Sequence, residues 1–216
     1  MRSQFDQQLK KLNTAMITMG SLCEDAIDHS MRALMARDKA IAAQVPELAG
    51  QIDQLEREIE AQCLKLLLQQ QPVARDLRVI SAALKMVTDL ERVGHQSAEI
   101  AEILEVMDLS AAPSLPAIRE MANATRKMVT NSISAFVHQD PALAKNVEAY
   151  DDVVDDYFVQ VRSQLIALLR DPAVDAESTV DLLMITKYFE RMGDHAVNIA
   201  GWVVYTATGS RESEGI

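Results

Sequence analysis

The sequence predicts an all-α protein of two homologous antiparallel three-helix bundles, with six helices in all, and three observations support this prediction. Glycine and proline are scarce, at 7 and 6 in 216 residues, which is too few for the turn-dense chains of β-sandwiches and barrels. Hydrophobic residues form 49% of the chain and recur at threes and fours rather than alternating with a period of two. The third observation is an internal repeat, which indicates two homologous bundles.

Prolines and capping residues divide the chain into the expected helices, because proline is disfavoured inside a helix and tolerated in its first turn. Pro46 sits too early in the second helix to break much of it. The third helix follows the turn in QQQPVARD, and the fourth follows DLSAAPSLP, the clearest linker. Asp140 before Pro141 starts the fifth, and Asp175 starts the sixth. The predicted helices span 5–37, 39–70, 74–107, 117–138, 141–170 and 175–208.

Apolar spacing is clearest in the fifth predicted helix, where seven residues form a seam at threes and fours. These are Val147, Tyr150, Val154, Phe158, Val161, Leu165 and Leu168. Such a seam is typical of a helix packed on two neighbours. Segments near 30 residues would be about 45 Å long at a rise of 1.5 Å per residue, which favours long antiparallel bundle helices.

The internal repeat relates the two halves of the chain. A shift of 102 positions aligns the second and fifth helices, through pairs such as Asp38 with Asp140 and Asp53 with Asp155. A shift of 99 aligns the third and sixth, and the difference falls in the QQQPVARD turn, where length changes are tolerated. The predicted organisation is a first bundle at 1–107, a linker at 108–116, a second bundle at 117–208 and a tail at 209–216.

Charge and composition exclude several classes of protein. The chain has 21 Lys and Arg against 32 Asp and Glu, a formal charge of −11, so it would repel the phosphate backbone and is not expected to bind nucleic acid. Cys23 and Cys63 match no metal-ligand spacing, which indicates buried thiols in a reducing compartment. There is no signal-peptide core and no apolar run of about 20 residues. We expect a cytoplasmic protein that meets the membrane only through partners.

Two acidic pairs in the second half predict a metal site. Asp151 and Asp155 stand four apart on one helix, and Glu190 and Asp194 stand four apart on another. Residues at that spacing share a helix face, where like charges repel each other unless a cation compensates them. Divalent ions such as Mg²⁺ or Mn²⁺, and iron, favour such oxygen ligands. The alternative is that these residues are only the solvent face of acidic helices.

A glycine also recurs in mid-helix, because ERVG at 91–94 returns as ERMG at 190–193. A helical glycine costs about 1 kcal/mol relative to alanine, so its double occurrence suggests close helix approach or backbone access. Together with ARDLR at 74–78, the segments LERVG at 90–94 and FERMGDHAVNIA at 189–200 resemble the PhoU family. These are accessory regulators of bacterial phosphate-specific transport. The resemblance implies two three-helix bundles and an E(D)xxxD motif for iron or other metal clusters.

Asp151, Asp155, Glu190 and Asp194 match the family motif residue by residue, and the first half departs from it. Ala49 stands where the second half has Asp151, and His95 stands where it has Asp194. Any first-half site at Asp53, Glu91 and His95 is therefore expected to be weak or altered, and the second-half site is favoured. An imidazole suits iron, zinc or nickel better than magnesium or calcium.

Arg75, Asp76 and Arg78 lie where a turn meets a helix start, and two interpretations of them stay open. They suit a contact with a partner protein, or they are the charged neighbours of a helix N-cap. His195 is expected to orient a carboxylate or lie at the surface, and no nucleophile motif is found.

The resemblance implies a non-enzymatic negative regulator of the phosphate-starvation response. It would couple the ATPase of the phosphate transporter to a sensor histidine kinase, bind a divalent or iron-type metal ion and form a homodimer. A ferritin-like di-iron enzyme is disfavoured, since no Glu-x-x-His occurs in the chain. The remaining alternatives are a helical interaction module, with or without metal, and a paralogue not dedicated to phosphate signalling.

Overall fold

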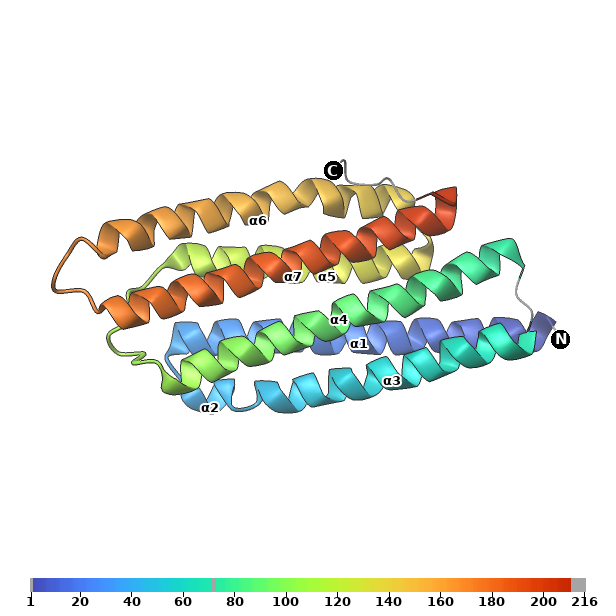
Figure 1. Cartoon of the computed structure of the whole chain (residues 1–216), viewed down its shortest axis with the longest axis horizontal. Helices are drawn as coiled ribbons and strands as arrows, with labels where there is room; N and C mark the ends of the chain where they lie inside the picture. Colours follow the sequence, from blue (N-terminus) through green and yellow to red (C-terminus); the bar gives the residue numbers. More distant parts are fainter. Residues whose placement is uncertain (1, 71–72, 211–216) are drawn as a thin grey trace.

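The computed structural model describes residues 2–70 and 73–210, and the side chains of 5–68 and 73–210. These residues form seven helices and no strand, which confirms the all-α class (Figure 1). Residues 211–216 of the predicted tail lie outside the described residues. The helices are α1 (Arg2–Ala36), α2 (Lys39–Ala42), α3 (Val45–Gln70), α4 (Ala74–Val106), α5 (Pro116–His138), α6 (Pro141–Leu168) and α7 (Ala176–Thr208).

Six of these helices match the six predicted ones, and α2 is the detached first turn of the second. The expectation that Pro46 would leave that helix largely continuous misses this break. Proline has no N–H to donate to the carbonyl of Ala42, and its ring conflicts with that carbonyl in a continuous helix. The chain therefore turns at 43–44, and α3 begins at Val45.

Side-chain caps begin α6 and α7 where the sequence predicted them. The carboxylate of Asp140 accepts hydrogen bonds from the backbone N–H groups of Ala142 and Leu143, both at 3.0 Å. The carboxylate of Asp175 accepts one from Ser178 N–H at 2.8 Å. Such bonds satisfy the N–H groups that a helix start leaves without partners, which explains why both helices begin at these residues.

The helices pack as two three-helix bundles that lie side by side along their length (Figure 1). In the first, α1, α3 and α4 contact one another, with α2 against α1 and α4, and in the second α5, α6 and α7 do so. The bundles meet where α4 packs on α7 and α1 packs on α5. In Figure 1 the neighbouring helices α3, α4, α7 and α6 form one layer, with α1 and α5 behind them. Buried hydrophobic side chains of both halves form one continuous core.

The linker between α4 and α5 is anchored to the rest of the fold. The guanidinium of Arg37, just after α1, donates to the carbonyl oxygens of Ser110 at 3.0 Å and Ala112 at 2.9 Å. Met107 and Leu109 are buried in the core. The linker thus holds the end of α1 against the start of α5, and the division of the chain into two folding units stays a prediction.

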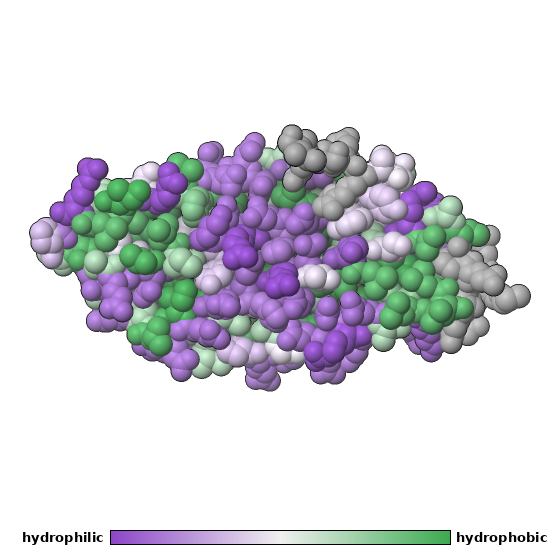
Figure 2. All heavy atoms as spheres, in the orientation of Figure 1, coloured by the Kyte–Doolittle hydropathy of each residue, from purple (hydrophilic) through white to green (hydrophobic). Residues whose placement is uncertain are grey.

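One face of the molecule is polar in the middle and apolar toward both ends (Figure 2). The exposed hydrophobic residues near the turn between α3 and α4 are Leu64, Leu68, Val73 and Leu77. Those near the turn between α6 and α7 are Ile166, Leu169, Val180 and Met184. None of the described helices combines the length and hydropathy that crossing a membrane requires.

Candidate metal centres and the contact between the halves

Each half has a close helix crossing at its repeated glycine. A Cβ placed on Gly94 of α4 would lie 2.9 Å from Cδ1 and 3.2 Å from Cγ2 of Ile52 on α3. A Cβ placed on Gly193 of α7 would lie 3.3 Å from Oδ1 of Asp151 on α6. The recurring glycine therefore marks a close approach of two helices, and each approach brings candidate ligand residues of the two helices together.

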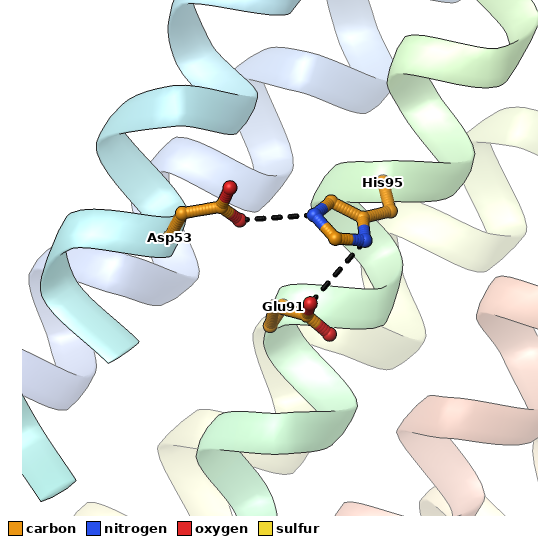
Figure 3. A group of neighbouring side chains, drawn as sticks. All are labelled: Asp53, Glu91 and His95. Carbon is orange, nitrogen blue, oxygen red and sulfur yellow. Dashed lines mark ion pairs between the residues drawn. The ribbon is translucent and has the colours of Figure 1, made fainter. Parts of the chain in front are cut away.

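In the first half, Asp53 of α3 faces Glu91 and His95 of α4 (Figure 3). Nε2 of His95 lies 3.1 Å from Oδ1 of Asp53, and its Nδ1 lies 3.2 Å from Oε1 of Glu91. The Glu91 side chain is 18% exposed, against 33% for Asp53 and 45% for His95. Both ring nitrogens thus face carboxylate oxygens at the edge of the bundle.

These three residues fit a metal ion of the iron, zinc or nickel kind. Their ligand atoms all lie within 4.8 Å of one another, and no other set of three or more His, Cys, Asp or Glu in the described part of the chain is gathered this closely. Oδ1 of Asp53 and Oε2 of Glu91 are buried and accept no well-formed hydrogen bond from described residues; each has only an ion pair, with His95 at 3.1 Å and with Arg92 at 3.6 Å. Buried acceptors without donors are costly, and a bound cation would satisfy them.

Glu56 is a third acidic residue at this place, beside Asp53 and Glu91, and the sequence analysis missed it. Burial raises the pKa of its carboxyl, and the charges of Glu60, Glu91 and Asp53 raise it further. It lies three positions after Asp53 on α3, so it shares a helix face with that residue. That spacing was the available signal, but the repeat hides it because the second half has Phe158 at the equivalent position.

In the second half, the structure brings the four predicted carboxylates into one electrostatic cluster. The pKa of Asp151 is raised to about 6, first by burial and then by the charges of Asp155, Asp194 and Glu190. The pKa values of Asp155 and Asp194 are also raised, first by burial and then by Glu190. Carboxylates from α6 and α7 therefore act on one another electrostatically, and whether they bind a metal stays a prediction.

A lysine that the sequence analysis did not consider lies within this second cluster. The ammonium of Lys187 forms an ion pair with Glu190, one turn later on α7. It lies 5.3 Å from the centre of the Phe158 ring of α6. Its positive charge also lowers the pKa values of Asp155 and Asp194, against the effect of burial. The second cluster thus has an internal cation.

Between the two clusters, polar pairs join α4 to α7. His195 Nδ1 lies 2.9 Å from Oδ1 of Asp89, with the two side chains 19% and 16% exposed. The hydroxyl of Tyr188 donates to Oε2 of Glu99 at 3.2 Å. His195 therefore orients a carboxylate, as one of the two expectations had it, and that carboxylate belongs to the other half of the chain.

Arg75 and Arg78 bind the second half of the same chain. Arg75 donates to Oε1 of Gln139 at 2.6 Å, and Arg78 donates to the carbonyl of Thr206 at 3.3 Å. The N-cap of α4 is Val73, which makes no side-chain cap, and Asp76 lies in the first helical turn. Negative charge is favourable there because of the helix dipole. A partner contact at Arg75, Asp76 and Arg78 stays a prediction.

A family profile, similar sequences and similar structures all point to the same family. The sequence profile of the PhoU domain matches residues 16–104 and 118–203, one match in each half. The "Phosphate-specific transport system accessory protein PhoU homolog" of Synechocystis sp. is 36% identical over 98% of this chain and 94% of its own. The protein of the same name from Pseudomonas aeruginosa is 32% identical over 96% of this chain and 86% of its own.

Two crystal structures share the fold. PhoU from Pseudomonas aeruginosa is 31% identical, with a TM-score of 0.89 over 95% of this chain and all of its own. The phosphate transport system regulatory protein PhoU from Streptococcus pneumoniae is 25% identical, with a TM-score of 0.90 over 97% of this chain. Since the profile matches both halves and the relatives span nearly the whole chain, the chain belongs to the PhoU family, with one PhoU repeat in each three-helix bundle.

Proposed function

We propose that this chain is a non-enzymatic negative regulator of the phosphate-starvation response that modulates phosphate uptake. The observation that carries the proposal is the family match over nearly the whole chain, with relatives named as accessory proteins of the phosphate-specific transport system. The regulator couples the ATPase of the phosphate transporter to a sensor histidine kinase in the cytoplasm. Its homodimer acts through protein contact.

The arrangement of side chains supports a scaffold rather than a catalyst. Long helices with one continuous core hold two acidic clusters at fixed places on α3 and α4 and on α6 and α7. Both cysteine thiols are buried, and burial raises their pKa values, so they are not poised as nucleophiles. Such a molecule works by presenting surfaces to partner proteins. Its charge and shape then determine which partners bind.

We also propose that the two clusters bind divalent or iron-type metal ions. The residues that would hold them are Asp53, Glu91 and His95 in the first half and Asp151, Asp155, Glu190 and Asp194 in the second. A bound ion supplies the positive charge that lets carboxylates from two helices remain together. The helices would then be cross-linked at the two crossings, where Gly94 and Gly193 already bring them close.

Co-purification from cells tests the contact that this function requires. A tagged full-length chain, expressed at native level, is recovered from cells grown in high and in low phosphate. We expect the transporter ATPase or the sensor kinase to be recovered with it in at least one of the two conditions. An unrelated acidic helical protein with the same tag serves as the control. Failure to recover either partner under both conditions would contradict the proposal.

A helical interaction module with no dedicated role in phosphate signalling is the second candidate. The departures of the first half from the family motif, Ala49 and His95, are the observations that favour it. Such a paralogue would bind metal and partners, yet its loss would leave expression of the phosphate-starvation genes unchanged. Measuring that expression in the deletion strain separates the two candidates.

A further inference from the structure

The two acidic clusters differ in the charged groups that lie beside their carboxylates. Under the repeat, Lys187 of α7 corresponds to Thr88 of α4, and Phe158 of α6 corresponds to Glu56 of α3. The first half therefore has an added carboxylate where the second has a ring. It also has an exposed hydroxyl where the second has an ammonium. The repeat makes the two helix pairs direct controls for each other.

Several contacts place the ammonium of Lys187 among the second-half carboxylates. It pairs with Glu190, and the Phe158 ring lies 5.3 Å from it across the crossing of α6 and α7. The face of an aromatic ring attracts a cation, so Phe158 favours this position of the ammonium. The field of Lys187 reaches both Asp155 and Asp194, whose pKa values it lowers. The lysine is thus close to three of the four predicted ligands.

The first cluster has no ammonium among its described residues. Two groups that can carry positive charge lie beside its carboxylates: the imidazole of His95, which is a metal ligand when neutral, and the guanidinium of Arg92, whose Nε lies 3.6 Å from Oε2 of Glu91 on a side chain that is 59% exposed. Oδ1 of Asp53 and Oε2 of Glu91 are held there only by ion pairs with His95 and Arg92, as Oε2 of Glu190 in the second cluster is held by Lys187. A metal ion entering the first cluster lies near the exposed guanidinium of Arg92 at its edge, whereas one entering the second must displace the ammonium of Lys187 from among the carboxylates or lie beside it.

We infer that Lys187 is a built-in counter-ion that competes with metal at the second-half cluster, so that at limiting metal the first-half cluster fills first. This inference rests on the proposed metal binding and concerns how the two sites are ranked. Ligand count alone predicts the opposite ranking, since the second half keeps four carboxylates. The competition arises because two positive charges a few ångströms apart repel each other even when solvent screens them.

Exchanging the residues at the two equivalent positions tests the inference. Mn²⁺ binding is measured by titration calorimetry on full-length, chelator-treated protein in two backgrounds. The first background carries Asp53→Ala and Glu91→Ala and keeps the second cluster intact. The second background carries Asp155→Ala and Asp194→Ala, which weaken the second cluster and keep the first intact. Lys187→Thr is added to the former background and Thr88→Lys to the latter. Lys65→Thr, which removes an exposed lysine outside both clusters, is the control.

We expect Lys187→Thr to tighten Mn²⁺ binding at the second cluster about tenfold and Thr88→Lys to weaken it at the first by a similar factor. Lys65→Thr should change neither value by more than about twofold. With Thr88 and Lys187 both unchanged, the first cluster should bind Mn²⁺ more tightly than the second. Circular dichroism of each variant checks that the helices are intact.

The inference is overturned if Lys187→Thr leaves second-cluster binding unchanged or weakens it, or if the second cluster binds first. It is equally overturned if the second cluster binds no Mn²⁺ with or without Lys187, because the lysine would then not be what limits binding. None of these results touches the proposed regulatory function, which is measured in cells without reference to metal.

Discussion

The carboxyl of Asp151 makes the stability of the fold depend on pH. Its pKa in the folded chain is about 6, raised first by burial and then by three neighbouring carboxylates, against 3.8 without those influences. A carboxyl whose pKa is raised by folding binds its proton more tightly in the folded state. Its contribution to stability is therefore complete below pH about 4 and is lost as the pH rises through about 6.

We therefore expect Asp151→Asn to stabilise the chelator-treated protein at pH 7.5, by up to about 1 kcal/mol after allowance for solvent screening. The difference from wild type should vanish near pH 4. Urea unfolding at several pH values measures it, with Asp152→Asn on the exposed neighbouring residue as the control. An Asn variant that is less stable than wild type at pH 7.5 would show that the charged carboxylate of Asp151 does not destabilise the fold.

At the residue scale, spacing predicted which carboxylates share a helix face and missed what else would lie among them. Asp151 and Asp155 share a face because four residues make about one helical turn, so their convergence needs only local geometry. Lys187 and Glu56 were missed because a long side chain has several rotamers. The rotamer of such a side chain depends on the neighbouring helix, and for Lys187 the neighbour is Phe158 of α6. Tertiary packing therefore determines which rotamer is adopted.

At the element scale, the crossing of α3 and α4 depends on the absence of a side chain at Gly94. Gly94→Ala would place a methyl group 2.9 to 3.4 Å from three atoms of Ile52, a buried β-branched residue with little freedom to move. Overpacking of this kind costs about 1–3 kcal/mol and outweighs the gain in helix propensity, about 1 kcal/mol. We expect a net loss of about 1 kcal/mol in urea unfolding.

Gly50 provides the matched control on the same helix pair. It is exposed in α3, and a Cβ placed on it would meet nothing within 4 Å. Gly50→Ala should therefore stabilise the protein by about 0.5–1 kcal/mol, through helix propensity alone. If Gly94→Ala also stabilises the protein, the two helices do not need a glycine to cross.

The helix boundaries were largely predictable because local chemistry sets them. Asp140 and Asp175 cap α6 and α7 through bonds to residues two and three positions later, which a sequence shows directly. The break before α3 was underestimated because a proline near a helix start is compatible both with continuation and with a new first turn. The structure resolves this in favour of a new turn, with Pro46 as the second residue of α3.

At the scale of the whole molecule, the continuous core predicts that both halves unfold together. Trp202 of α7, the single tryptophan, reports on the second half by fluorescence. Cys23 and Cys63 are buried in the first half, so their reaction with a thiol reagent reports on that half. We expect the two signals to change at the same urea concentration. Midpoints separated by more than about 0.5 M would show that the bundles unfold as separate units.

The duplicated architecture was predictable because the repeat preserves residues at equivalent helix positions, including Gly94 and Gly193. How the bundles lie against each other was not predicted. The pairs between α4 and α7, such as Asp89 with His195, join residues that are not equivalent under the repeat. A sequence compared with itself shows equivalent residues, not complementary ones.

Alkaline phosphatase activity in phosphate excess tests the central claim most directly. The chromosomal gene is deleted, and the strain is complemented with the full-length chain or with an empty vector, while wild-type cells give the repressed baseline. A negative regulator predicts high activity in the deletion strain despite abundant phosphate, and repression to the wild-type level when the chain is restored. Activity that stays at the repressed level after deletion would contradict the account and leave the chain as a PhoU-family protein with another role.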